Sequence, residues 1–214
     1  MYNSIVSFFQ DGGPFMYPIV VVLAIGLAIA LERYIYLTVS RASNRRMMSK
    51  LMPLLQRGDY KQVFALASKS NQAVSRILSM GLSRYKSASS RDDIETAMEE
   101  SMMEVLPRLE KRTHYLATFA NIATLLGLLG TIIGLIRAFT AVAQVDPALK
   151  AEILSTSISV AMNTTAFGLI VAIPLLLIHA VLQTKTTEIV DSLEMAVVKF
   201  VNLMMQRKSI SDAT

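Results

Sequence analysis

The chain has 214 residues, of which 53% are hydrophobic and 17% charged, and its mean hydropathy is +0.46. Soluble domains usually carry about a quarter charged residues, so this composition argues against an ordinary soluble enzyme and against a disordered chain. The formal net charge of +5 would suit nucleic acid, an anionic membrane surface or the basic loops of a membrane protein. Cysteine is absent, which excludes disulfides and thiolate metal sites, and two histidines argue against a multi-histidine metal centre. No cofactor is expected.

Three apolar segments are each long enough to cross a bilayer, which takes about 20 residues of helix. They are predicted as transmembrane helices at residues 16–37, 113–143 and 153–182. The first follows the loop signal Asp11-Gly12-Gly13-Pro14. It lacks a basic region before it and a small-residue cleavage site after it, so it is not expected to be a cleavable signal peptide. Only a short turn separates the second and third segments, which predicts a helical hairpin.

The basic residues are distributed unevenly along the chain. None precedes the first apolar segment, 15 of the 21 lie between Arg33 and Arg112, and four follow the third segment. Basic residues near the ends of spans stay on the cytoplasmic side. We therefore expect a periplasmic segment at 1–15, a cytoplasmic helical loop at 38–112, a periplasmic turn at 144–152 and a cytoplasmic helical tail at 183–214. The basic excess is explained by topology, and nucleic acid is not expected as a partner.

The long loop has helical signals of its own. Gly58-Asp59 separates a helix that ends near Leu55 from one that begins at Tyr60. Ser90 is placed to cap a further helix, with acidic residues in its first turn. A stripe of Met98, Met102, Val105 and Leu109 then leads towards the second apolar segment, and we expect its methionines to pack between helices. The prediction is an all-α membrane protein whose second and third helices continue into a helical cytoplasmic domain.

Small and hydroxylated residues recur at heptad spacing in the second apolar segment. The stripe consists of Ala117, Thr124, Thr131 and Ala138, and Asn121, Gly127 and Gly134 lie on about the same face. Gly130 and Gly134 also form a small-xxx-small pair, which favours close helix contact. In the third segment Asn163, Thr164 and Thr165 lie at mid-depth, followed by Pro174, which is expected to bend the helix. Helix packing and a polar pathway both explain these residues.

The second and third apolar segments contain no carboxylate. A proton relay needs a group that titrates, and hydroxyls do not do so near neutral pH. If this protein conducts protons, another chain must therefore supply the acid.

Three sequence blocks together resemble the MotA/TolQ/ExbB proton-channel family, and within it the ExbB/TolQ branch. They are GGPFMYPI with LERYIYL around the first segment, LLGLLGTIIGLIRAF in the second and MNTTAFGLIVAIP in the third. The resemblance implies a homo-oligomer, a pentamer, around a dimer of single-span partners of the ExbD/TolR type that carry the titratable Asp. It also implies that the family's pore threonines correspond to Thr131 and Thr165. The candidate ion pathway is Thr131, Thr165, Thr124, Thr164 and Asn163; the candidate packing positions are Gly127, Gly130, Gly134 and Pro174.

The sequence departs from the family's usual pattern at Val160, where the family commonly has Glu. Thr164 adds a hydroxyl where proton-driven members commonly have a small apolar residue, so a sodium-driven member is an alternative. The expected function is ExbB-like: a channel subunit in the bacterial inner membrane that couples ion flow to TonB-dependent uptake. A TolQ-like role in envelope integrity is the alternative, so a TonB- or TolA-like protein and membrane lipids are candidate partners. A self-sufficient transporter and a non-conducting scaffold are the other classes. An enzyme is not expected, because no nucleophile–base pair is evident.

Overall fold

The computed structural model describes residues 12–85, 90–143 and 145–212, without the side chains of residues 207–212. In these ranges the regular elements are helices, with no strand. They are α2 (Met16–Arg57), α3 (Tyr60–Ser68), α4 (Ala73–Tyr85), α5 (Arg91–Glu110), α6 (Thr113–Val142) and α7 (Lys150–Asp212). The chain divides into two compact units, each described separately below. After the predicted topology, we call Met1–Arg33 with Arg112–Val181 the spanning unit, and Tyr34–Lys111 with Leu182–Thr214 the extramembrane unit.

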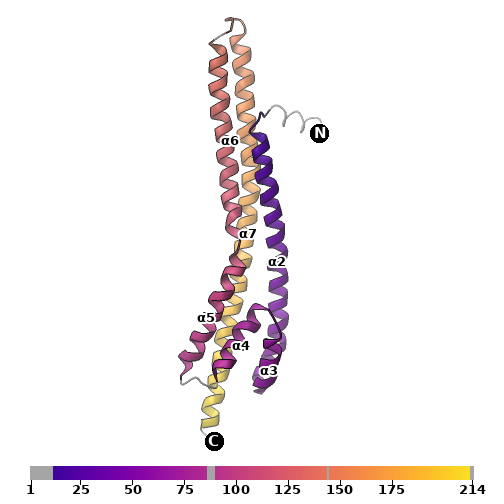
Figure 1. Cartoon of the computed structure of the whole chain (residues 1–214), viewed down its shortest axis with the longest axis vertical. Coiled ribbons are helices and arrows are strands. Elements are labelled where there is room, and N and C mark those ends of the chain that lie inside the picture. The colour runs from indigo at the N-terminus through magenta and orange to yellow at the C-terminus, as the bar shows by residue number, and fades with distance from the viewer. Residues whose placement is uncertain (1–11, 86–89, 144, 213–214) are drawn as a thin grey trace. The chain divides into compact units, whose positions relative to one another are not determined.

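Three helices, α2, α6 and α7, are long and apolar enough to cross a membrane (Figure 1). Most of the side chains in their apolar windows are exposed in the single chain. An apolar surface of this extent is stable only against lipid or another subunit. The structure thus confirms the predicted all-α membrane fold.

The helix lengths differ from the sequence prediction at two places. The first helix does not end near residue 37 but continues to Arg57 as a single 42-residue helix. The second helix is not continuous with the helix before it, because Arg112 adopts a left-handed φ of 65° between α5 and α6. The Arg112 side chain forms an ion pair with Glu32 of α2 inside the spanning unit, with its Nη1 at 3.2 Å from the carboxylate. The third helix, α7, has 63 residues and is as long as predicted.

The structure confirms the predicted break at Gly58-Asp59 and the predicted cap at Ser90, and it adds a cap at Asp59. Gly58 has a φ of 81°, a conformation that glycine adopts without strain, and Asp59 accepts a hydrogen bond from the Gln62 amide at 3.1 Å. Ser90 and Asp93 form a reciprocal capping box at the start of α5. Each cap satisfies an amide that has no partner within the helix.

Close packing holds the extramembrane unit together. The predicted stripe on α5 is confirmed, since Met98, Val105 and Leu109 are buried. A Cβ at Gly81 of α4 would lie 2.6 Å from Sδ of Met98 and 3.0 Å from Cε1 of Phe200 on α7. A methyl group at Gly81 would therefore require the Met98 side chain to move.

The first turn of α5 depends on its cap, so Ser90→Ala should increase hydrogen exchange there. Loss of an N-cap costs about 1 kcal/mol, which corresponds to roughly fivefold faster exchange of the first-turn amides. Thr96→Ala, an exposed change in the same helix, is the control and should leave these rates unchanged. Equal rates in Ser90→Ala and the unmodified chain would contradict this description of the cap.

Candidate functional site

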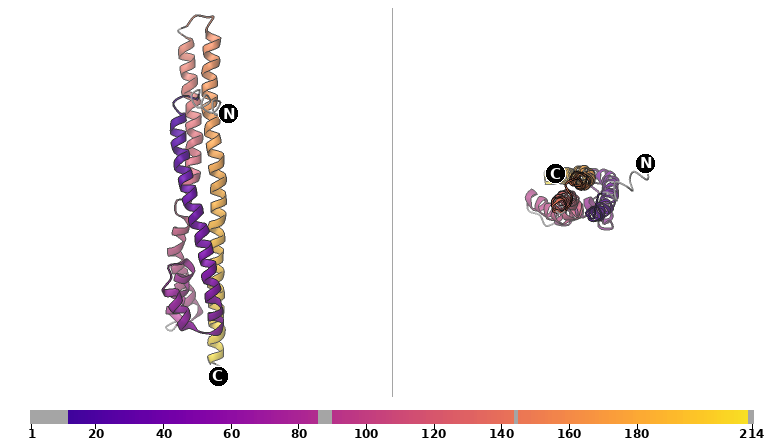
Figure 2. Two further views of the ribbon diagram at one scale, coloured as in Figure 1. Left: turned by 90° about the vertical axis from the view of Figure 1, so that its right-hand side faces the viewer. Right: turned by 90° about the horizontal axis from the view of Figure 1, so that it is seen from above.

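The site begins with a contact between the backbones of α6 and α7, which lie side by side in the spanning unit (Figures 1 and 2). A Cβ added to Gly168 of α7 would lie 2.7 Å from the carbonyl oxygen of Ala123 and 3.1 Å from Cα of Gly127. A Cβ added to Gly127 would lie 3.2 Å from Cα of Thr165. Because backbone atoms cannot move aside as a side chain can, Gly168 requires glycine at this distance, and a methyl group at Gly127 would require the two backbones to separate by a few tenths of an ångström.

Two further glycines of α6 extend this contact in antiparallel register. A Cβ at Gly130 would lie 2.4 Å from Cγ2 of Thr164, and one at Gly134 would lie 2.9 Å from Cβ of Ala161. The predicted packing positions Gly127, Gly130 and Gly134 are thus brought onto one face against α7. Small residues at such spacing let two spanning helices approach closely.

The hydroxyls of α6 lie beside this packing face. Thr124 donates to the Ala120 carbonyl at 3.1 Å and Thr131 to the Leu128 carbonyl at 2.6 Å, both within their own helix. Thr124 is exposed and Thr131 half-buried in the single chain. The heptad stripe therefore separates into a glycine row that faces α7 and a threonine edge that α7 does not cover.

Thr165 joins this edge from the other helix. Its hydroxyl donates to the Gly127 carbonyl at 2.8 Å, across the helix–helix contact. The register given by Gly127 and Gly130 places Thr165 between the levels of Thr124 and Thr131. The side chain is half-buried, so the three threonines lie at successive levels of one helix pair.

Thr164 has a different environment from these three threonines. It is 2% exposed, and its hydroxyl lies 2.6 Å from the carbonyl oxygen of Gly12 and 3.0 Å from that of Val160. It attaches the segment before α2 to α7. The structure does not bring Thr164 together with Thr124 and Thr131, although the sequence grouped them.

The two remaining predicted residues lie elsewhere on α7. Asn163 is two positions from Thr165, which is about 200° around the helix, and it is half-buried. Pro174 is exposed in the single chain, so contacts outside this chain would be needed for its predicted packing role.

A small cavity of about 130 Å³ adjoins Thr164. It could hold a few water molecules, each of which occupies about 30 Å³ in the liquid. Arg137, Ser157 and Val160 contribute to its lining. With Val160 in place of the family's Glu, no carboxylate lines this cavity.

This arrangement can relay hydrogen bonds but cannot bind and release protons. The hydroxyls of Thr124, Thr131 and Thr165 can each donate and accept a hydrogen bond, and α6 contains no Asp or Glu. Among the described residues no three His, Asp or Glu are grouped as a metal site. An acid for proton transfer would have to come from another chain.

The sequence did not single out two participants in this site. Gly168 makes the closest backbone contact of the hairpin, but one glycine in an apolar segment is not distinctive. The Gly12 carbonyl accepts from Thr164, which lies 152 residues away in the chain, and no periodicity reveals a pairing at that separation.

The described part of the chain has three apolar helices, and the hydroxyls of the site lie on α6 and α7, whose apolar segments contain no acid. Together these features define a multi-pass helical membrane protein. The chain matches the MotA/TolQ/ExbB proton channel family over residues 69–195, more than half of its length. It belongs to this family, which consists of channels rather than enzymes.

The chain is also similar to curated proteins of both branches. It is 28% identical to a putative biopolymer transport protein ExbB homolog of Methanothermobacter thermautotrophicus, covering 91% of this chain and 68% of that protein. It is 33% identical to the biopolymer transport protein ExbB of Aquifex aeolicus, covering 52% of this chain and 72% of that protein. It is 32% identical to the Tol-Pal system protein TolQ of Haemophilus influenzae, covering 44% of this chain and 40% of that protein.

The glycine contact predicts that Gly168→Ala destabilises the chain by about 1–3 kcal/mol, because the added methyl group meets backbone atoms. Gly26→Ala is a matched control: its Cβ would meet Cδ2 of Leu175 at 2.8 Å, the end of a flexible side chain. Both changes gain the same helix propensity, so the difference between them measures the backbone contact. Urea unfolding of the full chain in detergent checks this, and equal midpoints would contradict it.

Proposed function

We propose that this chain is the channel subunit of an ion-driven motor in the inner membrane, assembled as a homopentamer around a dimer of single-span partners. The partner supplies a titratable Asp next to the threonine edge formed by Thr124, Thr131 and Thr165. Ion flow past this edge drives a movement that is passed to periplasmic or outer-membrane proteins. The N-terminus lies in the periplasm and the C-terminus in the cytoplasm, as the distribution of basic residues favours.

The threonine edge is the observation that carries this proposal. It is polar and lies in the apolar part of the chain, yet α6 and α7 do not bury it against each other. Polar groups at such a position are costly unless they face protein or water. A ring of subunits around a polar partner provides both, and the partner also provides the missing carboxylate.

An ExbB-like role, coupled to TonB-dependent uptake, is favoured over a TolQ-like role. The two relatives above that share the larger part of this chain are named as ExbB proteins, and the similarity to TolQ covers a smaller part. Protons are favoured over sodium ions, because the sodium alternative depends on the hydroxyl of Thr164. That hydroxyl is buried against the carbonyl groups of Gly12 and Val160.

The proposal is tested by proton flux into liposomes that contain this chain and its single-span partner. Thr131→Val with Thr165→Val keeps the side-chain shape but removes both hydroxyls, and should reduce flux roughly tenfold, as expected for unpaired groups in a buried pathway. Thr131→Ser with Thr165→Ser keeps the hydroxyls and is the control.

Three outcomes separate the alternatives. Unchanged flux in the valine variant would remove these threonines from the ion pathway. No flux in any preparation, with the partner still bound, would indicate a scaffold. Flux from this chain alone would contradict the need for a partner acid.

A further inference from the structure

Charge is strongly segregated between two helices of the extramembrane unit. The part of α2 at residues 34–57 carries five basic residues and no acidic one. Helix α5 carries seven acidic residues and two basic ones, a net charge of −5. The net charges are equal and opposite, and the charged parts of the two helices, residues 41–57 and 92–110, are about 24 Å and about 27 Å long at 1.5 Å per residue.

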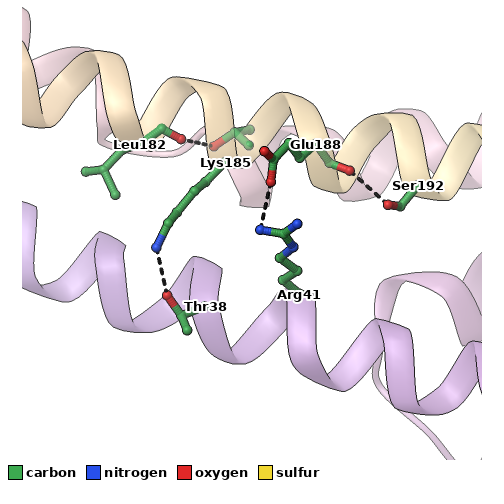
Figure 3. A network of polar contacts seen from close by, with 7 residues as sticks. Thr38, Arg41, Leu182, Lys185, Glu188 and Ser192 are labelled. Atoms are coloured by element: carbon green, nitrogen blue, oxygen red, sulfur yellow. Dashed lines mark hydrogen bonds and ion pairs between the residues drawn. The ribbon is translucent and has the colours of Figure 1, made fainter.

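Part of the basic face of α2 is not covered by any other described part of the chain. A groove of about 440 Å³ follows this face, and α2 alone lines it, with Thr38, Arg41, Ala42, Arg45, Arg46 and Ser49. Arg41 is neutralised by Glu188 of α7, with its Nη1 at 2.7 Å from the carboxylate (Figure 3). Arg45, Arg46 and Lys50 are exposed and form no ion pair with the residues that the structure describes.

The acidic face of α5 is likewise open. Glu104 pairs with Arg76 of α4 at 3.5 Å, and Glu95 pairs with Arg91 of its own helix at 3.3 Å. Asp92, Glu99 and Glu100 are exposed and have no ion-pair partner among the described residues. No ion pair joins α2 to α5 within the described part of one chain, so each face leaves charges that the chain itself does not neutralise.

We propose that the basic face of α2 docks onto the acidic face of α5 in a second copy of this chain. The contact is heterologous, since two different faces of one protein meet, and repeated contacts of this kind close into a ring. A contact of either face with the same face of a second copy would place like charges together and would be repelled. The inference rests on the proposed ring assembly and adds the surface that sets the order and spacing of its subunits outside the membrane.

A second copy of the chain explains the uncovered charges on both helices, whereas an anionic membrane would explain only those on α2. Acidic lipid headgroups would attract the face around Arg45 and Arg46, but they would repel the face around Glu99 and leave it without a partner. A neighbouring copy neutralises both faces at once and matches them in length.

The chain contains no cysteine, so introduced thiols test the contact cleanly. A tagged full-length Arg46→Cys chain is co-expressed with an untagged Glu99→Cys chain in nanodiscs of phosphatidylcholine. We expect mild oxidation to give cross-linked heterodimers at least about fivefold in excess of either homodimer, and this excess to fall in high salt, which screens exposed charges beyond about 3 Å at 1 M. As a control for the register of the contact, Arg46→Cys is also paired with Met103→Cys in place of Glu99→Cys. Met103 is an exposed, uncharged residue of α5.

Charge reversal distinguishes the occupants. In a cysteine-free background, Arg45→Glu with Arg46→Glu should weaken association of the full chain about fivefold, and Glu99→Lys with Glu100→Lys in the same chain should restore it. Failure of the lysine variant to restore association, together with loss of the heterodimer cross-link when phosphatidylglycerol replaces phosphatidylcholine in the nanodisc, would identify lipid as the occupant of the basic face and overturn the inference. A ring that forms without the heterodimer cross-link would also overturn it while leaving the proposed function intact; failure to form any oligomer would overturn both.

Discussion

The contact between the α6 and α7 backbones at Gly127 and Gly168 determines the rest of the spanning unit. It leaves no room for a side chain at Gly168 and little at Gly127, and it brings the Thr165 hydroxyl within 2.8 Å of the Gly127 carbonyl. Since the glycine row occupies the buried face, the threonines of α6 must lie on the edge beside it. Helix packing and the polar edge are therefore two consequences of one arrangement, although the sequence presented them as competing explanations.

The same arrangement explains why this chain depends on others. Its three apolar helices leave most of their surface exposed, its polar edge is open, and its second and third apolar segments contain no acid. In the other unit, residues 34–57 of α2 and helix α5 carry equal and opposite net charges, and part of each set has no ion-pair partner in the described part of the chain. Each of these surfaces needs lipid, water or another chain to cover it, which is consistent with membership of a family of proton channels.

The sequence predicted those features that depend on local pattern or composition. The all-α fold, the apolar helices, the Ser90 cap and the buried stripe through Met98 follow from periodicity and capping rules. It did not predict features that depend on contacts between distant residues. The burial of Thr164 against Gly12, the closeness of Gly168 to Ala123 and the division of the heptad stripe required the register of two helices, which no spacing within one helix specifies. The continuation of α2 to Arg57 was missed because its polar second half hides the continuity of the helix.

The accessibility of introduced thiols in the assembled complex with the partner tests the central claim most directly. Thr131→Cys and Thr165→Cys should react with a small, water-soluble methanethiosulfonate reagent, because the proposed ion pathway is wet along the threonine edge. Leu125→Cys and Leu177→Cys, at side chains that are 61% and 64% exposed in the single chain, should remain unreactive because they face lipid. Reaction at the leucine positions with protection at the threonine positions would contradict the account.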